Sequence, residues 1–383
     1  MLLSPPPLLQ QLRELIALPS ISSVSPDYDQ GNLAVVERLG EWLEGMGFKT
    51  ELLPLPNQPG KANLIATLGQ GPGGLILAGH TDTVPCDPHL WRQDPFRLHE
   101  ADGRLYGLGT CDMKGFFPLV MEAAQGLRGA DLREPLIILA TADEESSMGG
   151  AKALVAAGRP RARYAVIGEP TNLRPVRMHK GVMMAGIRLV GRSGHSSDPS
   201  LGVSALEGMY QVMGELLAFR QELQAHYRND AFRVPVPTLN LGRIHGGDNP
   251  NRICGACELH IDLRPLPGMD LEDLHHTLQT RLADRLAGSA LELTVSPLSS
   301  GTPALETPAH SPLVRAAERF SGVAAETVAF GTEGPYFREL GADTLIFGPG
   351  DIAQAHQPNE YLALDRIQPT VTIVKQLIRQ FCC

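Results

Sequence analysis

The chain has 383 residues, more than one hydrophobic core usually organises, so two domains are expected. With 43% hydrophobic and 20% charged residues, the composition allows a sizeable core and argues against a disordered chain. The formal net charge of −9 disfavours nucleic acid as a main partner, because phosphate binding needs surfaces rich in Lys and Arg.

No apolar run approaches the length of a membrane span, and the start, MLLSPPPLLQ, lacks a basic leading segment and is interrupted by prolines. We therefore expect neither a membrane association nor a signal peptide. Cys254 and Cys257 have CxxC spacing, but no second pair follows and no helix start surrounds them. This favours two small residues on a strand over a zinc or redox motif. Reduced thiols in the cytoplasm are the matching expectation.

The first part of the chain predicts an α/β domain with a mainly parallel sheet. Apolar residues recur at helical spacing between Gly31 and Gly47. Four short aliphatic runs follow, as expected of strands buried on both faces: NLIATLG (63–69), GLILAGH (74–80), PLIILATAD (135–143) and RYAVIGEP (163–170). Helical stretches around 115–128 and 149–158 lie between the later runs, and this alternation is typical of parallel sheets.

A different pattern begins after residue 179. The next predicted elements are a strand, a helix, two strands, a helix and a strand, at 181–191, 201–226, 237–247, 253–264, 270–287 and 290–298. This is the ferredoxin-like order. From residue 300 the α/β pattern returns, with a helix near 311–321 and the run DTLIFGPG. We therefore predict a domain of residues 180–299 inserted between two parts, 1–179 and 300–383, of the first domain.

Acidic and histidine side chains stand where the predicted strands of the first domain end. In open α/β sheets, ligands bind at the carboxyl ends of strands. Three strand ends and two neighbouring loops supply seven such side chains: His80, Asp82, Asp112, Glu144, Glu145, Glu169 and His356. We expect these side chains to form one site.

Each of these residues also has a purely structural explanation. His80 could be a core histidine, and Asp112 could cap a helix that begins near Lys114. The remaining alternatives are loop or turn positions: Glu144, Glu145, Glu169 before Pro170, and His356 beside Pro358. Taken together, the strand-end placement favours the functional interpretation.

The residue types indicate a metal site. The seven side chains include two histidines and no cysteine, which suits zinc, cobalt or manganese. The two histidines and three of the carboxylates are enough for two ions that share a bridging carboxylate. Glu144 and Glu145 are adjacent, and neighbouring loop residues cannot readily both bind one ion. One can bind metal while the other faces the attacking water as the general base of a hydrolysis.

Several motifs resemble the signature set of the co-catalytic zinc aminoacylase family, which includes succinyl-diaminopimelate desuccinylase and carboxypeptidase G-type metallopeptidases: GHTDTVP, LYGLGTCDMKG, TADEES, IGEPT, GRSGHSSDP and QAHQPNE. The resemblance covers nearly the whole chain. It implies a homodimeric hydrolase of N-acyl amino acids with two ions per subunit, zinc or else cobalt. It also implies that the inserted domain serves as a dimerisation and lid domain, and that the Asp112–Met113 peptide is cis.

The resemblance further implies roles for single residues. His80 and Glu169 would bind one ion, Glu145 and His356 the other, and Asp112 both. The catalytic group would comprise the general base Glu144, Asp82, which orients His80 through a hydrogen bond, and His195, which reaches the partner subunit's site. Five positions would contact substrate: Lys180, Asn251, Arg264, Gly331 and Thr332.

Some alternatives stay open at this point. His195 could be a loop histidine that caps the helix beginning near Leu201. The thiol of Cys111, next to Asp112, could make the site sensitive to oxidation, and Gly334 replaces an alanine that relatives carry, which could loosen a substrate loop. A catalytically silent metal-binding dimer is the rival from another class, but metal binding would not need Glu144.

Overall fold

The computed structural model describes residues 5–383, which form two compact units. The core unit comprises the chain up to Arg177, Thr307–Glu326 and Thr332–Cys383, and the inserted unit comprises Met178–Glu306 and Thr327–Gly331. No helix among the described residues is long and apolar enough to cross a bilayer.

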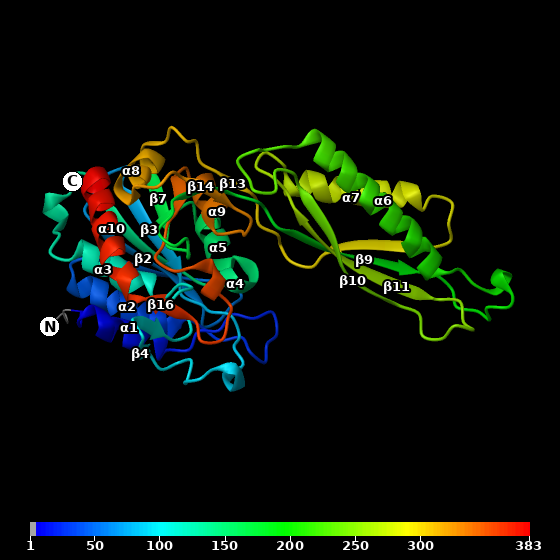
Figure 1. The fold of residues 1–383 in the computed structure, drawn as a ribbon, viewed down its shortest axis with the longest axis horizontal. Helices are drawn as coiled ribbons and strands as arrows, with labels where there is room; N and C mark the ends of the chain where they lie inside the picture. The colour runs from blue at the N-terminus through cyan, green and yellow to red at the C-terminus, as the bar shows by residue number, and fades with distance from the viewer. Residues whose placement is uncertain (1–4) are drawn as a thin grey trace. The chain divides into compact units, whose positions relative to one another are not determined.

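A twisted mixed sheet has the strand order β1-β2-β6-β3-β7-β15-β8-β13, with β14 paired to β8, and its strands from β1 to β15 in that order belong to the core unit (Figure 1). β6, β3, β7 and β15 run parallel, whereas β1 and β2 are antiparallel to their neighbours. The strands are β1 (Lys49–Pro54), β2 (Ala62–Leu68), β3 (Leu75–His80), β6 (Leu136–Thr141), β7 (Tyr164–Ile167), β8 (Val176–His179), β13 (Leu305–Glu306), β14 (Glu326–Val328) and β15 (Asp343–Ile346).

Helices cover both faces of this sheet because its strands are apolar on both sides. Leu77 and Ile138 point into one core with four helices: α2 (Leu33–Gly45), α3 (Phe116–Ala124), α8 (Pro312–Ser321) and α10 (Ile367–Cys382). Ile76 and Ile137 point into a second core with two helices: α5 (Gly149–Ala157) and α9 (Gly334–Glu339). The predicted α/β class is confirmed, and the continuous aliphatic runs are explained by burial on two faces.

Smaller elements complete the core unit. A three-stranded sheet has the order β16-β5-β4, from β4 (His99–Ala101), β5 (Arg104–Tyr106) and β16 (Tyr361–Ala363). The helix α1 (Leu8–Ile16) buries Leu12 and Ile16 against Leu98 and Leu105. The short helix α4 (Glu144–Ser147) follows β6 directly.

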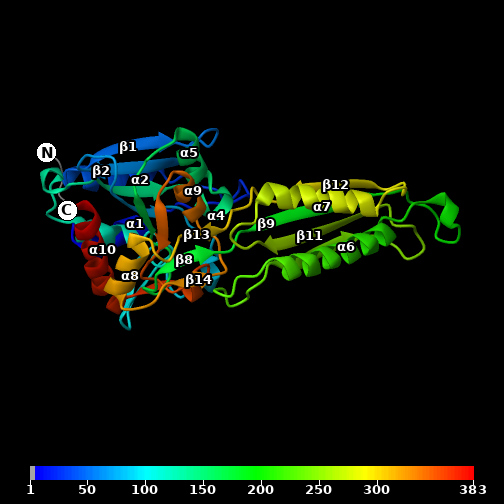
Figure 2. The same ribbon diagram turned by 90° about the horizontal axis from the view of Figure 1, so that it is seen from above.

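The inserted unit is a four-stranded antiparallel sheet, β10-β11-β9-β12, with two helices on one face (Figure 2). Its elements are β9 (Met183–Val190), α6 (Ala205–His226), β10 (Thr238–Gly246), β11 (Ala256–Arg264), α7 (Leu271–Arg285) and β12 (Glu292–Pro297). Alternate residues of β11, including Leu259 and Ile261, are buried under Met209, Leu216 and the other apolar residues of the helices. The element order is the ferredoxin-like order expected from the sequence.

Candidate metal centre

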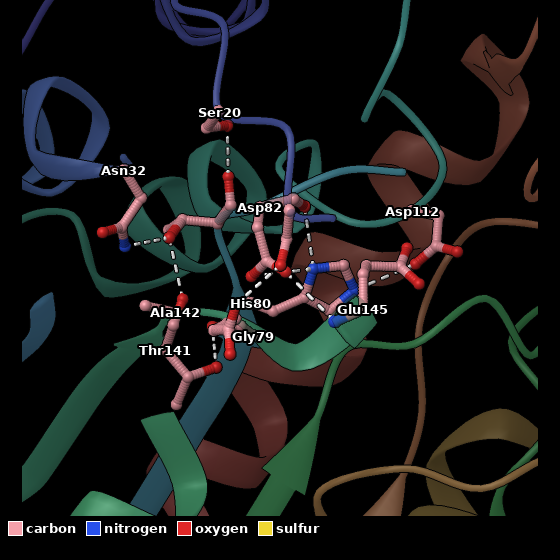
Figure 3. A network of polar contacts seen from close by, with 12 residues as sticks. Ser20, Asn32, Gly79, His80, Asp82, Asp112, Thr141, Ala142 and Glu145 are labelled. Atoms are coloured by element: carbon pink, nitrogen blue, oxygen red, sulfur yellow. Dashed lines mark hydrogen bonds and ion pairs between the residues drawn. The ribbon is translucent and has the colours of Figure 1, made fainter. Parts of the chain in front are cut away.

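Three neighbouring parallel strands bring the candidate residues to one edge of the core-unit sheet. β3 pairs with β6 so that His80 lies opposite Thr141, and with β7 so that Ala78 lies opposite Ile167. The segments that leave these strands carry Asp82, Glu144–Glu145 and Glu169. Figure 3 shows the His80 ring among Asp82, Asp112 and Glu145.

The ligand atoms form three overlapping groups, and within each group all atoms lie within 4.8 Å of one another. The groups are His80–Asp112–Glu169, Asp112–Glu145–His356 and His80–Glu144–Glu145. The first two groups share Asp112, which is the arrangement expected of a carboxylate between two ions. The sequence-derived set therefore converges in space, although its members are up to 276 positions apart (356 − 80).

His80 is oriented as a metal ligand. Its ring is 1% exposed, and Nδ1 lies 2.9 Å from the carbonyl oxygen of Asp82, to which it donates as Nδ1–H. Nε2 then faces Asp112 Oδ1 at 3.1 Å and Glu169 Oε1 at 3.8 Å. A backbone carbonyl on the far nitrogen is a common way of fixing the tautomer of a ligating histidine.

The expected hydrogen bond from His80 to the Asp82 carboxylate is not formed. Asp82 Oδ1 lies 3.8 Å from Nδ1, since the backbone carbonyl of the same residue occupies the donor. The other carboxylate oxygen accepts the N–H of Glu145 at 3.1 Å. Asp82 thus interacts with His80 as a nearby charge and also fixes the Glu144–Glu145 turn.

Asp112 faces both histidines and does not cap a helix. His356 Nε2 lies 3.5 Å from Asp112 Oδ2 and 3.1 Å from Glu145 Oε1. The helix α3 begins only at Phe116, with Gly115 before it, so the capping alternative for Asp112 is wrong. The Asp112–Met113 peptide is cis, as expected from the resemblance.

The electrostatics of the cluster indicate a deficit of positive charge. Burial, together with neighbouring Asp112, raises the pKa of Glu169 well above its usual value. Burial also raises the pKa of Glu144 and of Glu145. Hydrogen bonds with Asp112 and Glu145 raise the pKa of His356 to about 10. Burial would also raise the pKa of Asp112, but hydrogen bonds with the two histidines of the cluster outweigh it and lower the pKa. Three glutamates that hold protons this tightly beside an ionised aspartate form an environment that divalent cations neutralise.

The donor set therefore fits two divalent ions. Each of the two groups joined at Asp112 offers one imidazole nitrogen and carboxylate oxygens, a mixed N/O set that suits zinc and its neighbours. Burial would lower the pKa of His80, but the hydrogen bond with Asp112 and the neighbouring carboxylates raise it well above its usual value. His80 Nε2 and His356 Nε2 both face the carboxylates and would therefore offer their lone pairs to metal once deprotonated.

A supporting carboxylate escaped the sequence analysis. Glu360 is 1% exposed, and its side chain accepts the backbone N–H groups of Gly109 (3.1 Å), Cys111 (2.7 Å) and Asp112 (3.0 Å). It thereby fixes the loop that carries Asp112. Glu360 is the last residue of the motif QAHQPNE, and its place in this motif could have marked it as part of the site.

Cys111 itself is buried and donates its thiol to the Asp351 carbonyl oxygen at 3.4 Å. Burial raises the pKa of this thiol above its usual value. The side chain is therefore not poised as a reactive thiolate, contrary to the expectation from its place beside Asp112.

Most of the proposed catalytic and substrate-contact residues of the inserted unit form hydrogen bonds with neighbours in the same unit. His195 is exposed; its Nδ1 accepts the backbone N–H of Ser197 at 3.2 Å, so the ring hydrogen is on Nε2. The capping alternative for His195 is wrong, because Asp198 caps the 3₁₀ turn at Pro199–Leu201 and Ser204 caps α6. The Asn251 carbonyl accepts the N–H of Ser196, beside His195.

The other substrate-contact candidates are not grouped with His195. Lys180 Nζ donates to the Val236 carbonyl at 2.7 Å, and Arg264 Nε to Asp262 at 3.0 Å. Gly331 ends the second segment of the inserted unit, and Thr332, fully buried, begins the next segment of the core unit.

Comparison with known proteins agrees with this geometry. The profile of peptidase family M20/M25/M40 matches residues 76–380. The chain belongs to this family. An acetylornithine deacetylase from Edwardsiella ictaluri (strain 93-146) is 49% identical over 377 residues, which cover 98% of each chain. The family places the chain among hydrolases, and the resemblance inferred from the motifs is confirmed.

Solved structures of the M20 family share the fold. A metallo-carboxypeptidase from Sulfolobus solfataricus has a TM-score of 0.76 at 18% identity, over 97% of this chain and 98% of that chain. A dinuclear metal-binding peptidase from Bacillus subtilis has a TM-score of 0.69 at 15% identity, over 98% of this chain and 97% of that chain.

Proposed function

We propose that this M20-family hydrolase removes acetate from N2-acetyl-L-ornithine, with two divalent ions per subunit, zinc being the best match to the ligands. The reaction would be the ornithine-forming deacetylation of arginine biosynthesis. The observation that carries the proposal is the cluster of two overlapping ligand groups joined at Asp112, buried apart from the exposed His356 and the half-buried Glu145, with the further carboxylate Glu144 beside it. The substrate follows the 49%-identical relative, which bears the name acetylornithine deacetylase.

In this proposal His80 and Glu169 hold one ion, Glu145 and His356 hold the other, and Asp112 contributes to both. When bound, the ions polarise the amide carbonyl and lower the pKa of the attacking water. A dinuclear centre is consistent with the description of the Bacillus subtilis relative.

Glu144 moves the protons. Its carboxylate belongs to a ligand group with His80 and Glu145, yet the two groups joined at Asp112 are complete without it. It would accept the proton of the attacking water and return it to the nitrogen of the leaving amine. Burial raises its pKa, which favours holding that proton between the two steps.

His195 supplies a hydrogen-bond donor to the developing oxyanion. The contact of Nδ1 with the Ser197 N–H leaves Nε2–H free to donate, and the ring is exposed. The family resemblance of GRSGHSSDP suggests that this donor acts in the partner subunit's site of a homodimer. Such a donor is worth roughly 2.7–4 kcal/mol of transition-state stabilisation in other hydrolases.

The side-chain preference is tested by measuring amine release from N-acetylornithine, N-acetylcitrulline, N-acetylmethionine and N-succinyl-diaminopimelate. We expect kcat/KM to be highest for acetylornithine. A higher value for another substrate would reassign the enzyme within the family, and no hydrolysis of any of them by the metal-loaded protein would support the catalytically silent alternative.

A further inference from the structure

A buried ion pair lies beneath the turn that carries Glu144 and Glu145. Lys61 Nζ is 2.5 Å from Asp143 Oδ1 and 2.8 Å from Asp29 Oδ1. The side chains of Lys61 and Asp143 are only 8% and 3% exposed. Charged side chains are seldom buried this deeply, and neither residue is a ligand or a proton carrier in the chemistry proposed above.

The Asp143 carboxylate joins three parts of the core unit. It accepts hydrogen bonds from four side chains: Lys61 (2.5 Å), Ser22 (2.7 Å), Gln58 (3.4 Å) and Ser147. Ser22 also donates its backbone N–H to the carbonyl of Thr83, next to Asp82. The two acidic segments of the site are thus connected through Ser22, by its side chain on one side and its backbone on the other.

The contacts of Lys61 and Asp143 have the geometry of an ion pair. Lys61 Nζ contacts both Asp143 Oδ1 and Asp29 Oδ1, and Asp143 Oδ1 also accepts the hydroxyl of Ser22. The two side chains are therefore held by each other and by neighbours on both sides.

The backbone of Asp143 turns the chain from β6 into α4. Its φ of 61° and ψ of 32° lie in the left-handed region, which is uncommon for any residue other than glycine and is best tolerated by Asn and Asp. Such a conformation persists where the surroundings hold it in place. Here the surroundings are the donors to the Asp143 carboxylate.

Glu144 depends on this turn more than Glu145 does. The N–H of Glu145 bonds to Asp82 at 3.1 Å, and its carboxylate contacts His356 at 3.1 Å. The Glu144 carboxylate instead lies within 4.8 Å of the ligand atoms of His80 and Glu145. The direction of Glu144 therefore depends on the backbone of the turn and on packing within the cluster.

We propose that Lys61 and Asp143 are positioning residues: their ion pair holds the turn so that the Glu144 carboxylate is aimed for proton transfer. The inference rests on the proposed role of Glu144. Glu145 keeps its place through Asp82 and His356, so loss of the ion pair displaces the base more than the metal ligand.

The test uses Asp143→Asn and the double variant Lys61→Met/Asp143→Asn. Asparagine keeps the size and the left-handed tolerance of aspartate, and Lys61 retains Asp29 in the single variant. The double variant leaves no unpaired charge on either residue. We expect both proteins to bind two ions with unchanged affinity and nearly unchanged KM, and kcat to fall about 10–100-fold, as for small misplacements of catalytic groups.

Arg159→Met is the control, because it removes an exposed ion pair with Glu51 in the same unit. This variant should leave metal affinity, KM and kcat unchanged. Wild-type kcat in a folded Asp143→Asn protein would overturn the inference, as would a loss of metal affinity that parallels the loss of kcat. If the double variant does not fold, the single variant decides. Glu144→Ala with full turnover would instead reject the proposed function.

Discussion

The two units differ in how their candidate residues are arranged. In the core unit, side chains from five segments meet in one cluster, which is open to solvent at His356, because parallel strands end at the same edge of a sheet. In the inserted unit, His195 and Asn251 lie together on exposed loops, while Lys180 and Arg264 are held elsewhere by local partners. The core unit therefore gathers the candidate metal ligands in one place, whereas the proposed substrate contacts of the inserted unit are spread over separate segments.

Metal removal should give the largest difference between the two units, because only the core unit holds the proposed metal ligands. Chelation should reduce turnover to background, and reconstitution should restore it with close to two ions per chain, measured by elemental analysis. Hydrogen exchange should quicken around Asp82 and Glu145 in the chelated protein, because the carboxylates lose their counter-charge, and stay unchanged in β9–β12. Full turnover in the chelated protein would refute the metal centre.

His195→Ala should lower kcat by about 10²–10³-fold, the usual effect of losing one oxyanion donor, and leave the metal content unchanged. A mixed dimer of His195→Ala with Glu144→Ala tests whether the donor crosses between subunits. One site of that dimer would then have intact Glu144 and intact His195, and activity should return. Confirmed mixed dimers without activity would rule out the crossing.

The smallest expected effect is on stability, and it comes from His179, a buried residue of the inserted unit. Burial lowers its pKa from 6.5 to about 4. Below pH 6.5 the unfolded chain binds a proton that the folded protein does not, so stability falls as the pH falls, by about 2 kcal/mol between pH 7 and pH 5. The His179→Gln protein should lack this part of the pH dependence of the unfolding free energy, measured with urea. If wild type and variant show the same pH dependence, the lowered pKa of His179 is contradicted.

The sequence predicted the elements that carry strong periodicity or long aliphatic runs. β3, β6 and β7 begin and end within a few residues of the expected runs, and the helix expected at 201–226 starts at Ala205, because residues 199–201 form a 3₁₀ turn. The metal cluster was predictable because strand ends converge by topology.

Other features lacked a local signal. β1 is partly exposed, and the antiparallel direction of β2 depends on pairing with β6 and cannot be read from its composition. The ion pair of Lys61 with Asp143 joins residues 82 positions apart, and Glu360 acts on backbone N–H groups 248–251 positions away. The carbonyl contact of His80 depends on the local backbone angles at Asp82.

The most direct test of the metal-and-base assignment is to measure metal content and acetate release on the same sample of Glu144→Ala. We expect close to two ions per chain and a kcat lower by about 10²–10⁴-fold, because one residue serves both proton transfers. Glu145→Ala, the matched control, should lose metal. Wild-type turnover by Glu144→Ala, or loss of its ions, would contradict the division of roles between these two neighbouring carboxylates.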